Sequence, residues 1–125
     1  MTSMVDTSVL IDYLRGHDGA ADLLERARTT GPLHASEITR IEILAGMRKG
    51  EEEPTRSLFA SLAWHEVDVA VAEEAGALGR AWLPGHQGID SADLAIAATA
   101  ILNRADLLTL NVRHFPMFPN LRRPY

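Results

Sequence analysis

The chain has 125 residues, of which 46% are hydrophobic and 23% charged, with a formal net charge of −5 and no cysteine. This length and composition predict one globular domain with a buried core, and the missing cysteines exclude a disulfide framework or a thiolate zinc site. The negative charge argues against a protein that holds nucleic acid on a broad basic face. Neither a secretory signal nor a membrane-spanning apolar run is visible, so a cytoplasmic location is expected.

Short apolar segments alternate with longer segments of helical periodicity along the chain. Polar capping residues and glycine or proline stops mark where the helices begin and end. In chain order we expect a strand at 4–5, helices at 7–15 and 18–28, a strand at 33–35, helices at 36–48 and 55–63, a strand at 65–69, helices at 71–83 and 90–103, and a strand at 106–110, before a loop that leaves room for a last edge strand. This alternation predicts an α/β fold with a mainly parallel sheet of four to five strands, covered by helices on both faces, in one domain spanning residues 1–125.

Acidic side chains occur where the surrounding sequence is otherwise apolar or small. Asp6 ends the first strand, and Glu42 lies between two isoleucines. Asp90 and Asp93 share one face at the start of an alanine-rich helix. Because the functional crevice of a parallel sheet lies at the carboxyl ends of its strands, Asp6 and Asn111, which follows the last strand, are expected on one edge. Carboxylates this close repel one another unless a cation lies between them.

A set of oxygen ligands matches the preference of Mg²⁺ or Mn²⁺. The five histidines contain no i,i+4 pair, so their spacing does not indicate a zinc site. One oxygen-ligated ion, or two about 3.5–4 Å apart, can hold a phosphodiester, activate a water and stabilise the leaving oxygen. The expected chemistry is therefore phosphodiester hydrolysis.

Each of these residues also has a structural interpretation, and the sequence alone leaves both open. Asp6 could cap the helix that follows it, Asp90 could cap the alanine-rich helix, and Asp93 could complete that cap. Glu42 could complete a capping box with Thr39, in the pattern Thr-x-x-Glu. The asparagine after the last strand is also a common turn residue.

Three stretches carry a resemblance to a known family: VDTSVLIDYL at the start, ITRIEILAGMRKG in the middle and DLAIAATAILNRADLLTLNVRHF near the end. In this order and at this spacing, the chain resembles the PIN-domain ribonucleases, and among them the VapC toxins of bacterial VapBC toxin–antitoxin modules. The likeness covers essentially the whole chain. It implies a three-layer α/β/α sandwich.

The resemblance also assigns site residues. Asp6, Glu42 and Asp93 match the family's metal-binding and catalytic acids. The fourth family position is often Asp or Asn, and here it is Asn111. The additional residues are Asp90, expected as an auxiliary ligand, and two supporting hydroxyl residues, Thr7 and Thr109.

The function implied by the resemblance is that of the toxin component of a type II toxin–antitoxin system. Such a toxin is a Mg²⁺-dependent endoribonuclease, with Mn²⁺ as a substitute, that hydrolyses phosphodiester bonds in RNA, typically tRNA or rRNA. The resemblance also implies a homodimer and a cognate VapB-type antitoxin, with a heterotetramer or larger assembly between them. Arg113, Arg122 and Arg123, in the basic last part of the chain, are expected to contact RNA phosphates.

Rival interpretations differ in the residues that they require. A PIN-fold binding module without catalysis has no need of the three acids, which stand where the chemistry needs them. A receiver-type phosphoacceptor domain needs a lysine after its last strand, and the only lysine, Lys49, lies at a helix end. A DNA nuclease of the wider fold would be longer, with more acidic residues and basic loops.

Overall fold

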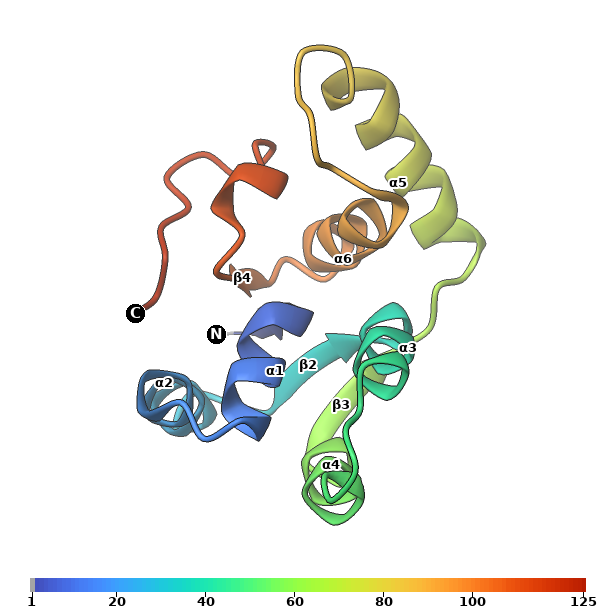
Figure 1. Ribbon diagram of the computed structural model, residues 1–125. Helices are drawn as coiled ribbons and strands as arrows, with labels where there is room; N and C mark the ends of the chain where they lie inside the picture. The colour runs from blue at the N-terminus through green and yellow to red at the C-terminus, as the bar shows by residue number, and fades with distance from the viewer. Residues whose placement is uncertain (1) are drawn as a thin grey trace.

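The computed structural model describes residues 2–125 (Figure 1). Short strands alternate with helices throughout, as the sequence predicts. The elements are β1 (Ser3–Val5), α1 (Thr7–Leu14), α2 (Asp18–Arg28), β2 (Leu33–Ser36), α3 (Glu37–Ala45), α4 (Glu52–Ala60), β3 (Leu62–His65), α5 (Val69–Trp82), α6 (Ser91–Leu102), β4 (Asp106–Leu108) and a short 3-10 helix, η1 (Val112–His114).

Within residues 2–125, four strands form one sheet in the order β3-β2-β1-β4, and all neighbouring strands are parallel. Val5 of β1 lies opposite Leu108 of β4, so the residues that follow, Asp6 and Thr109, emerge side by side. Because every strand runs in the same direction, the carboxyl ends meet at one edge of the sheet. This edge carries the candidate site.

The two faces of the sheet have separate hydrophobic cores, because successive strand residues point to opposite sides. Val5, Leu33 and Ala35 pack with buried residues of α1 to α4. Met4 and Leu107 pack on the other face with buried residues of α6 and with Phe115. Figure 1 shows α5 and α6 on one side of the sheet and α1 and α2 on the other. The expected three-layer α/β/α arrangement is therefore confirmed.

Helix α6 is buried from Asp93 to Ala100 between α5 and the sheet. Its alanines and isoleucines leave no wide polar face, so the helix can be covered on several sides. Although α6 is strongly apolar, neither it nor any other helix described between residues 2 and 125 has the length and apolar character needed to cross a membrane.

The third strand was expected at 65–69, and this position is wrong. The strand runs from Leu62 to His65, and α5 begins at Val69. The Asp68 carboxylate accepts a hydrogen bond from the Val71 amide at 2.9 Å and caps α5. A capping residue ends extended structure, so the valines at 67 and 69 do not belong to a strand.

Further boundaries differ from expectation. Helix α3 ends at Ala45, three residues before the expected end, and β4 ends at Leu108, two residues early. Helix α4 begins at Glu52, three residues before the expected start, and includes Pro54 in its first turn. Proline is tolerated there because the first amides of a helix have no intrahelical acceptor, and the acidic residues beside it favour the positive end of the helix dipole. In place of a last edge strand, the segment after β4 forms η1 and then irregular structure.

Candidate active site

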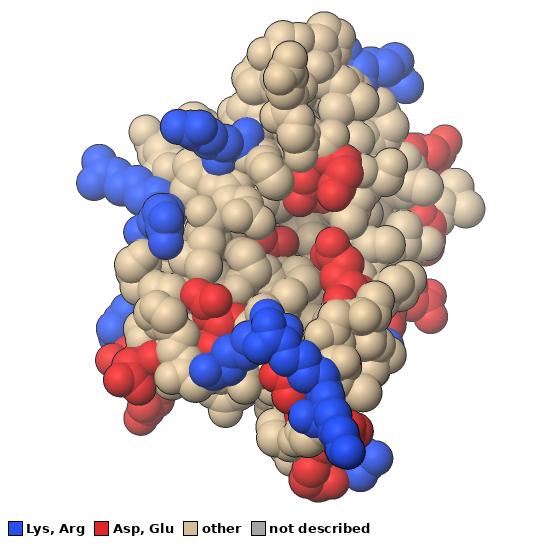
Figure 2. All heavy atoms as spheres, in the orientation of Figure 1, with Lys and Arg blue, Asp and Glu red and all other residues tan. Residues whose placement is uncertain are grey.

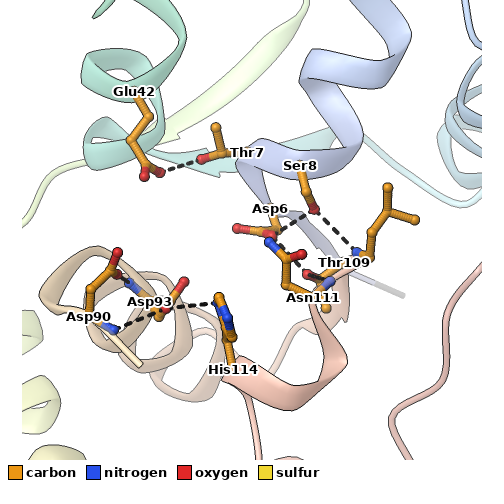
Figure 3. Close-up of polar contacts among 10 residues, drawn as sticks. Asp6, Thr7, Ser8, Glu42, Asp90, Asp93, Thr109, Asn111 and His114 are labelled. Atoms are coloured by element: carbon orange, nitrogen blue, oxygen red, sulfur yellow. Dashed lines mark hydrogen bonds and ion pairs between the residues drawn. The ribbon is translucent and has the colours of Figure 1, made fainter. Parts of the chain in front are cut away.

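Asp6 lies at the carboxyl end of β1 and is 3% exposed. Its Oδ2 accepts hydrogen bonds from the Ser8 hydroxyl at 2.8 Å and from the Thr109 hydroxyl at 2.7 Å (Figure 3). Although Asp6 occupies the N-cap position of α1, its side chain accepts no capping hydrogen bond from the residues that the structure describes. The interpretation of Asp6 as a side-chain cap is therefore wrong.

Glu42 extends from α3 toward the start of α1. The Thr7 hydroxyl donates to Glu42 Oε1 at 2.6 Å, and the Thr7 oxygen lies 3.0 Å from the Thr39 hydroxyl oxygen. Ser36 caps α3, since its side chain accepts a hydrogen bond from the Ile38 amide at 3.2 Å. Thr39 therefore lies inside the helix, and the capping-box interpretation of Glu42 is wrong.

Asp90 and Asp93 form a reciprocal capping box at the start of α6. Asp90 Oδ1 accepts from the Asp93 amide at 2.8 Å, and Asp93 Oδ2 accepts from the Asp90 amide at 3.1 Å. Asp93 Oδ2 also lies 3.2 Å from His114 Nδ1. The cap expected of Asp90 is thus confirmed, and Asp93 combines a role in that cap with a contact to η1.

Burial raises the pKa of Asp93 to about 6, because an ionised carboxylate loses hydration in a buried position. The negative charge of Asp90 raises this pKa further, whereas the Asp90 backbone amide and His114 oppose the rise. The carboxylate therefore carries its charge at a cost that comes first from burial and then from the neighbouring negative charge of Asp90. A cation beside Asp93 would favour its ionised form and offset that cost.

The four carboxylates share one hydrogen-bonding pattern. Asp6, Glu42, Asp90 and Asp93 each engage one oxygen with a donor of the protein, and the other oxygen accepts no hydrogen bond from residues 2–125. Figure 3 shows the four side chains around a common space. In Figure 2, acidic side chains surround a hollow in the middle of the face. The donors orient the carboxylates and leave oxygens available to a ligand.

This donor set fits a hard divalent cation. As the side chains stand, no three His, Asp or Glu residues in the described part of the chain approach closely enough to enclose an ion. Mg²⁺ does not require such a cage, since it keeps several waters and is commonly held by one or two carboxylates together with substrate phosphates. The carboxylate oxygens around the open space suit that mode of binding.

The remaining predicted residues fall into two groups. Asn111 follows β4 beside Asp6, and Thr7 and Thr109 are the buried donors to Glu42 and Asp6 (Figure 3). The arginines are divided: Arg113 and Arg123 line a hollow beside the carboxylates, and Arg122 is not among its lining residues.

Sequence reasoning missed Ser8 and His114. Ser8 stands two residues after Asp6, donates to Asp6 and accepts from the Leu110 amide. The Asp-Thr-Ser stretch therefore indicated a hydroxyl donor for Asp6. His114 was set aside with the other histidines because none has zinc-type spacing. Its contact with Asp93 depends on η1, which the sequence did not predict.

Comparisons with known proteins agree with this fold. The family model for the PIN domain matches residues 3–118. The chain is 46% identical over 123 residues to ribonuclease VapC19 of Mycobacterium tuberculosis, covering 98% of each chain. It is 40% identical over 122 residues to ribonuclease VapC10 of the same organism, covering 98% of this chain and 92% of the relative. A toxin–antitoxin complex from Klebsiella pneumoniae contains a chain of the same fold, with a TM-score of 0.80, 28% identity and coverage of 99% and 98%. The chain therefore belongs to the PIN-domain family, and within it to the VapC ribonucleases.

Proposed function

We propose that this protein is the toxin of a type II toxin–antitoxin system and acts, as a single PIN domain over residues 1–125, as a Mg²⁺-dependent endoribonuclease. The observation that carries the proposal is the shared carboxylate pattern, in which each acid has one oxygen held by the protein and one left toward a common space. The relatives named as ribonucleases support RNA as the substrate. We expect tRNA or rRNA to be the RNA class.

In this proposal Asp6, Glu42 and Asp93 hold the metal ion, with Asp90 and Asn111 as auxiliary oxygen ligands. A bound divalent ion supplies charge stabilisation to the phosphodiester and lowers the pKa of a bound water. Mn²⁺ would serve as a substitute, because it also prefers oxygen ligands.

The protein's own contribution is to fix the acids before substrate binds. Thr109 and Ser8 orient Asp6 through two short hydrogen bonds, and Thr7 orients Glu42 through one. The capping box fixes the Asp93 side chain at the start of a buried helix. Groups fixed in this way need little rearrangement when charge develops during the reaction.

This preorganisation favours catalysis over a PIN-fold binding module. A binding module would have no use for a buried Asp6, 3% exposed, that still keeps one oxygen without a donor from residues 2–125. Among the described residues this oxygen is not one of the fully buried unpaired atoms, so it reaches the open space and is accessible to a ligand.

We further propose that a cognate VapB-type antitoxin binds the protein, supported by the toxin–antitoxin complex among its structural neighbours. A basic side chain of the antitoxin could occupy the acidic space and neutralise its charge. We expect a homodimer of the toxin and a heterotetramer or larger complex with the antitoxin, in the cytoplasm where the RNA is.

The test is cleavage of total cellular RNA by the purified, antitoxin-free protein in Mg²⁺, in Mn²⁺ and in EDTA. We expect discrete products with either metal and none in EDTA. Asp93→Asn should lower the cleavage rate on the order of 10³-fold, as found when a group that stabilises transition-state charge is removed. Asparagine can still accept the Asp90 amide, so the variant should remain folded.

The matched control is Asp106→Asn, which removes a carboxylate at the opposite end of β4 and should cleave like the wild type. Absence of cleavage by folded wild-type protein in every metal would contradict the proposal and favour the binding module. Equal loss in both variants would show that the effect follows net charge and not the site.

A further inference from the structure

A hollow of about 410 Å³ lies beside the carboxylates, at the junction of the segment after β4 with the end of the chain. Its lining residues are Leu110, Asn111, Val112, Arg113, His114 and Arg123. Two of them also belong to the candidate active site: Asn111 lies beside Asp6, and His114 contacts Asp93 (Figure 3). The hollow is therefore adjacent to the space that the acids surround.

The hollow carries positive charge that the protein does not neutralise. Neither Arg113 nor Arg123 makes an ion pair or a side-chain hydrogen bond with any residue from 2 to 125. In contrast, Arg15, Arg40 and Arg56 each pair with a glutamate. Residues 109–125 contain no aspartate or glutamate. Figure 2 shows basic side chains over this segment, on the left of the acidic hollow.

Both ends of the segment that presents the arginines are fixed. At one end, Thr109 bonds Asp6, and the Leu110 amide donates to Ser8 at 3.2 Å. At the other end, the Tyr125 hydroxyl donates to Asp12 at 2.9 Å. The Tyr125 ring also packs against His17, with ring centroids 4.9 Å apart. Between these ends Phe115 is fully buried in the core below α6. The two guanidinium groups thus project from backbone that is ordered before any ligand binds.

We infer that Arg113 and Arg123 form a subsite for a phosphate of the RNA strand next to the phosphate that is cleaved, and that Arg122 is outside it. Guanidinium groups bind phosphate oxygens in a bidentate geometry, and two of them converging on one hollow suit a single phosphate. This inference rests on the proposed function, because the acidic space alone would repel RNA. The subsite supplies the attraction that brings the strand to the carboxylates despite a net charge of −5.

The test measures binding separately from cleavage. A fluorescein-labelled, single-stranded oligoribonucleotide of mixed sequence is titrated with the full chain in EDTA at several salt concentrations, and anisotropy gives Kd. We expect Arg113→Gln and Arg123→Gln each to weaken binding roughly tenfold, the value of one charge-assisted hydrogen bond. Because both arginines bind the same phosphate, the double variant should reduce the slope of log K against log salt by about 0.7, the contribution of one phosphate contact in single-stranded nucleic acid.

Two control variants decide whether the loss of RNA affinity depends on the position of the arginine or only on its charge. Arg80→Gln removes an exposed arginine from α5 and serves as the distant control. Arg122→Gln makes the same change next to Arg123, and we expect a smaller loss than at either lining arginine. Equal losses in all four variants, or binding like the wild type in the Arg113 and Arg123 variants, would overturn the subsite.

The outcomes also separate this inference from the proposed function. In a cleavage assay with Mg²⁺, the subsite variants should show a raised KM and a nearly unchanged kcat, because the flanking phosphate takes no part in the chemical step. If the wild type binds RNA through Arg113 and Arg123 but does not cleave it, the proposed function fails and the subsite stands. If the wild type cleaves RNA and these variants share its KM, the subsite fails and the function stands.

Discussion

The two halves of the sheet treat their polar groups differently. Around the carboxyl ends of β1 and β4, four acids from the end of β1, from α3 and from the start of α6 keep one oxygen each free of protein donors within residues 2–125. At the outer edge, where the edge strand β3 lies beside β2 and close to α3, polar groups pair with one another. The Arg40 guanidinium bonds Glu37 and lies over the Trp64 ring, 4.0 Å from its centroid. The comparison indicates that free carboxylate oxygens mark the site, whereas the charged and aromatic groups at the outer edge are paired. Among the described residues, the Thr55 hydroxyl of α4 is a buried scaffold group without a partner.

The aromatic and histidine side chains of the outer edge illustrate this pairing in detail. The Trp64 indole donates to the Phe59 carbonyl at 2.9 Å, and its ring meets Phe59 edge to face. On the neighbouring strands, His34 Nδ1 lies 2.8 Å from His65 Nε2, so one neutral ring donates to the other. We expect substitutions here to change stability and those at the acidic end to change catalysis.

Beyond the loss expected from replacing an acid itself, the largest effect comes from removing a donor that orients an acid. Thr109→Val deletes the hydroxyl that donates to Asp6 while keeping the shape of a fully buried side chain. Loss of such an orienting contact typically costs 10- to 100-fold in metal affinity or activity, and we expect a loss of roughly that size in kcat/KM for RNA. Steady-state cleavage as a function of metal concentration measures it.

The matched control is Thr99→Val, which deletes an equally buried hydroxyl that bonds only the Ala95 carbonyl within α6. Thr109→Val loses two hydrogen bonds, the one to Asp6 and the one from the Asn111 amide, and should lose about 2 kcal/mol of unfolding free energy. Thr99→Val loses one and should lose about 1 kcal/mol. An equal loss of cleavage in the two variants would show that cleavage depends on the stability of the fold and not on the orientation of Asp6. It would contradict the separation of roles between the two halves of the sheet.

A smaller effect is expected at the outer edge. Arg40→Ala removes the ion pair with Glu37 and the stacking on Trp64, and should lower the free energy of unfolding by about 1 kcal/mol while leaving RNA cleavage unchanged. Urea unfolding measures the change. Arg56→Ala is the control, because Arg56 pairs with Glu53 on the exposed surface, where an ion pair contributes little. A decrease in cleavage by Arg40→Ala would contradict the separation of roles.

The smallest effect is a pH dependence of stability. Burial, and then the nearby His65, lower the pKa of His34. The unfolded chain therefore binds a proton more readily than the folded protein, so this pair stabilises the fold above the ordinary histidine pKa of about 6.5 and loses that contribution as the pH falls through it. Asp93 contributes in the opposite direction, because its raised pKa favours the protonated folded state at acidic pH.

Because the two groups act in opposite directions, the measurement compares the pH dependence of stability between the wild type and single variants. The free energy of unfolding is obtained from urea titrations at pH 7.5 and 5.5 for the wild type, His34→Gln and the control His86→Gln. We expect a smaller decrease at pH 5.5 in the His34 variant than in the other two. The same decrease in all three would exclude the histidine pair as its source.

Sequence patterns predict much of this molecule where the information is local. The alternation of strands and helices predicts the parallel sheet, and the apolar run after Asp93 predicts a buried α6. Asp68 shows the limit of such patterns. It lies within a valine-rich segment typical of a strand, but its side chain bonds the Val71 amide and begins a helix.

The candidate site depends on contacts that no short stretch contains. Whether Glu42 caps its own helix or faces the site is decided by Thr7, 35 residues earlier, and the orientation of Asp6 is decided by Thr109. The residues that bear the carboxylates are therefore visible in the sequence. The donors that orient them are not, apart from hydroxyls that the family resemblance implies.

The hydrogen bond between Asp6 and Thr109 spans 103 residues, and it has a consequence for the order of events during synthesis. At roughly 5–20 residues per second, a ribosome needs about 5 to 20 s to make the chain between them. During that time β1 has no β4 beside it, and Asp6 lacks its buried partner. A growing chain thus carries its acids in separate places and becomes competent to damage RNA only after nearly all of it has been made.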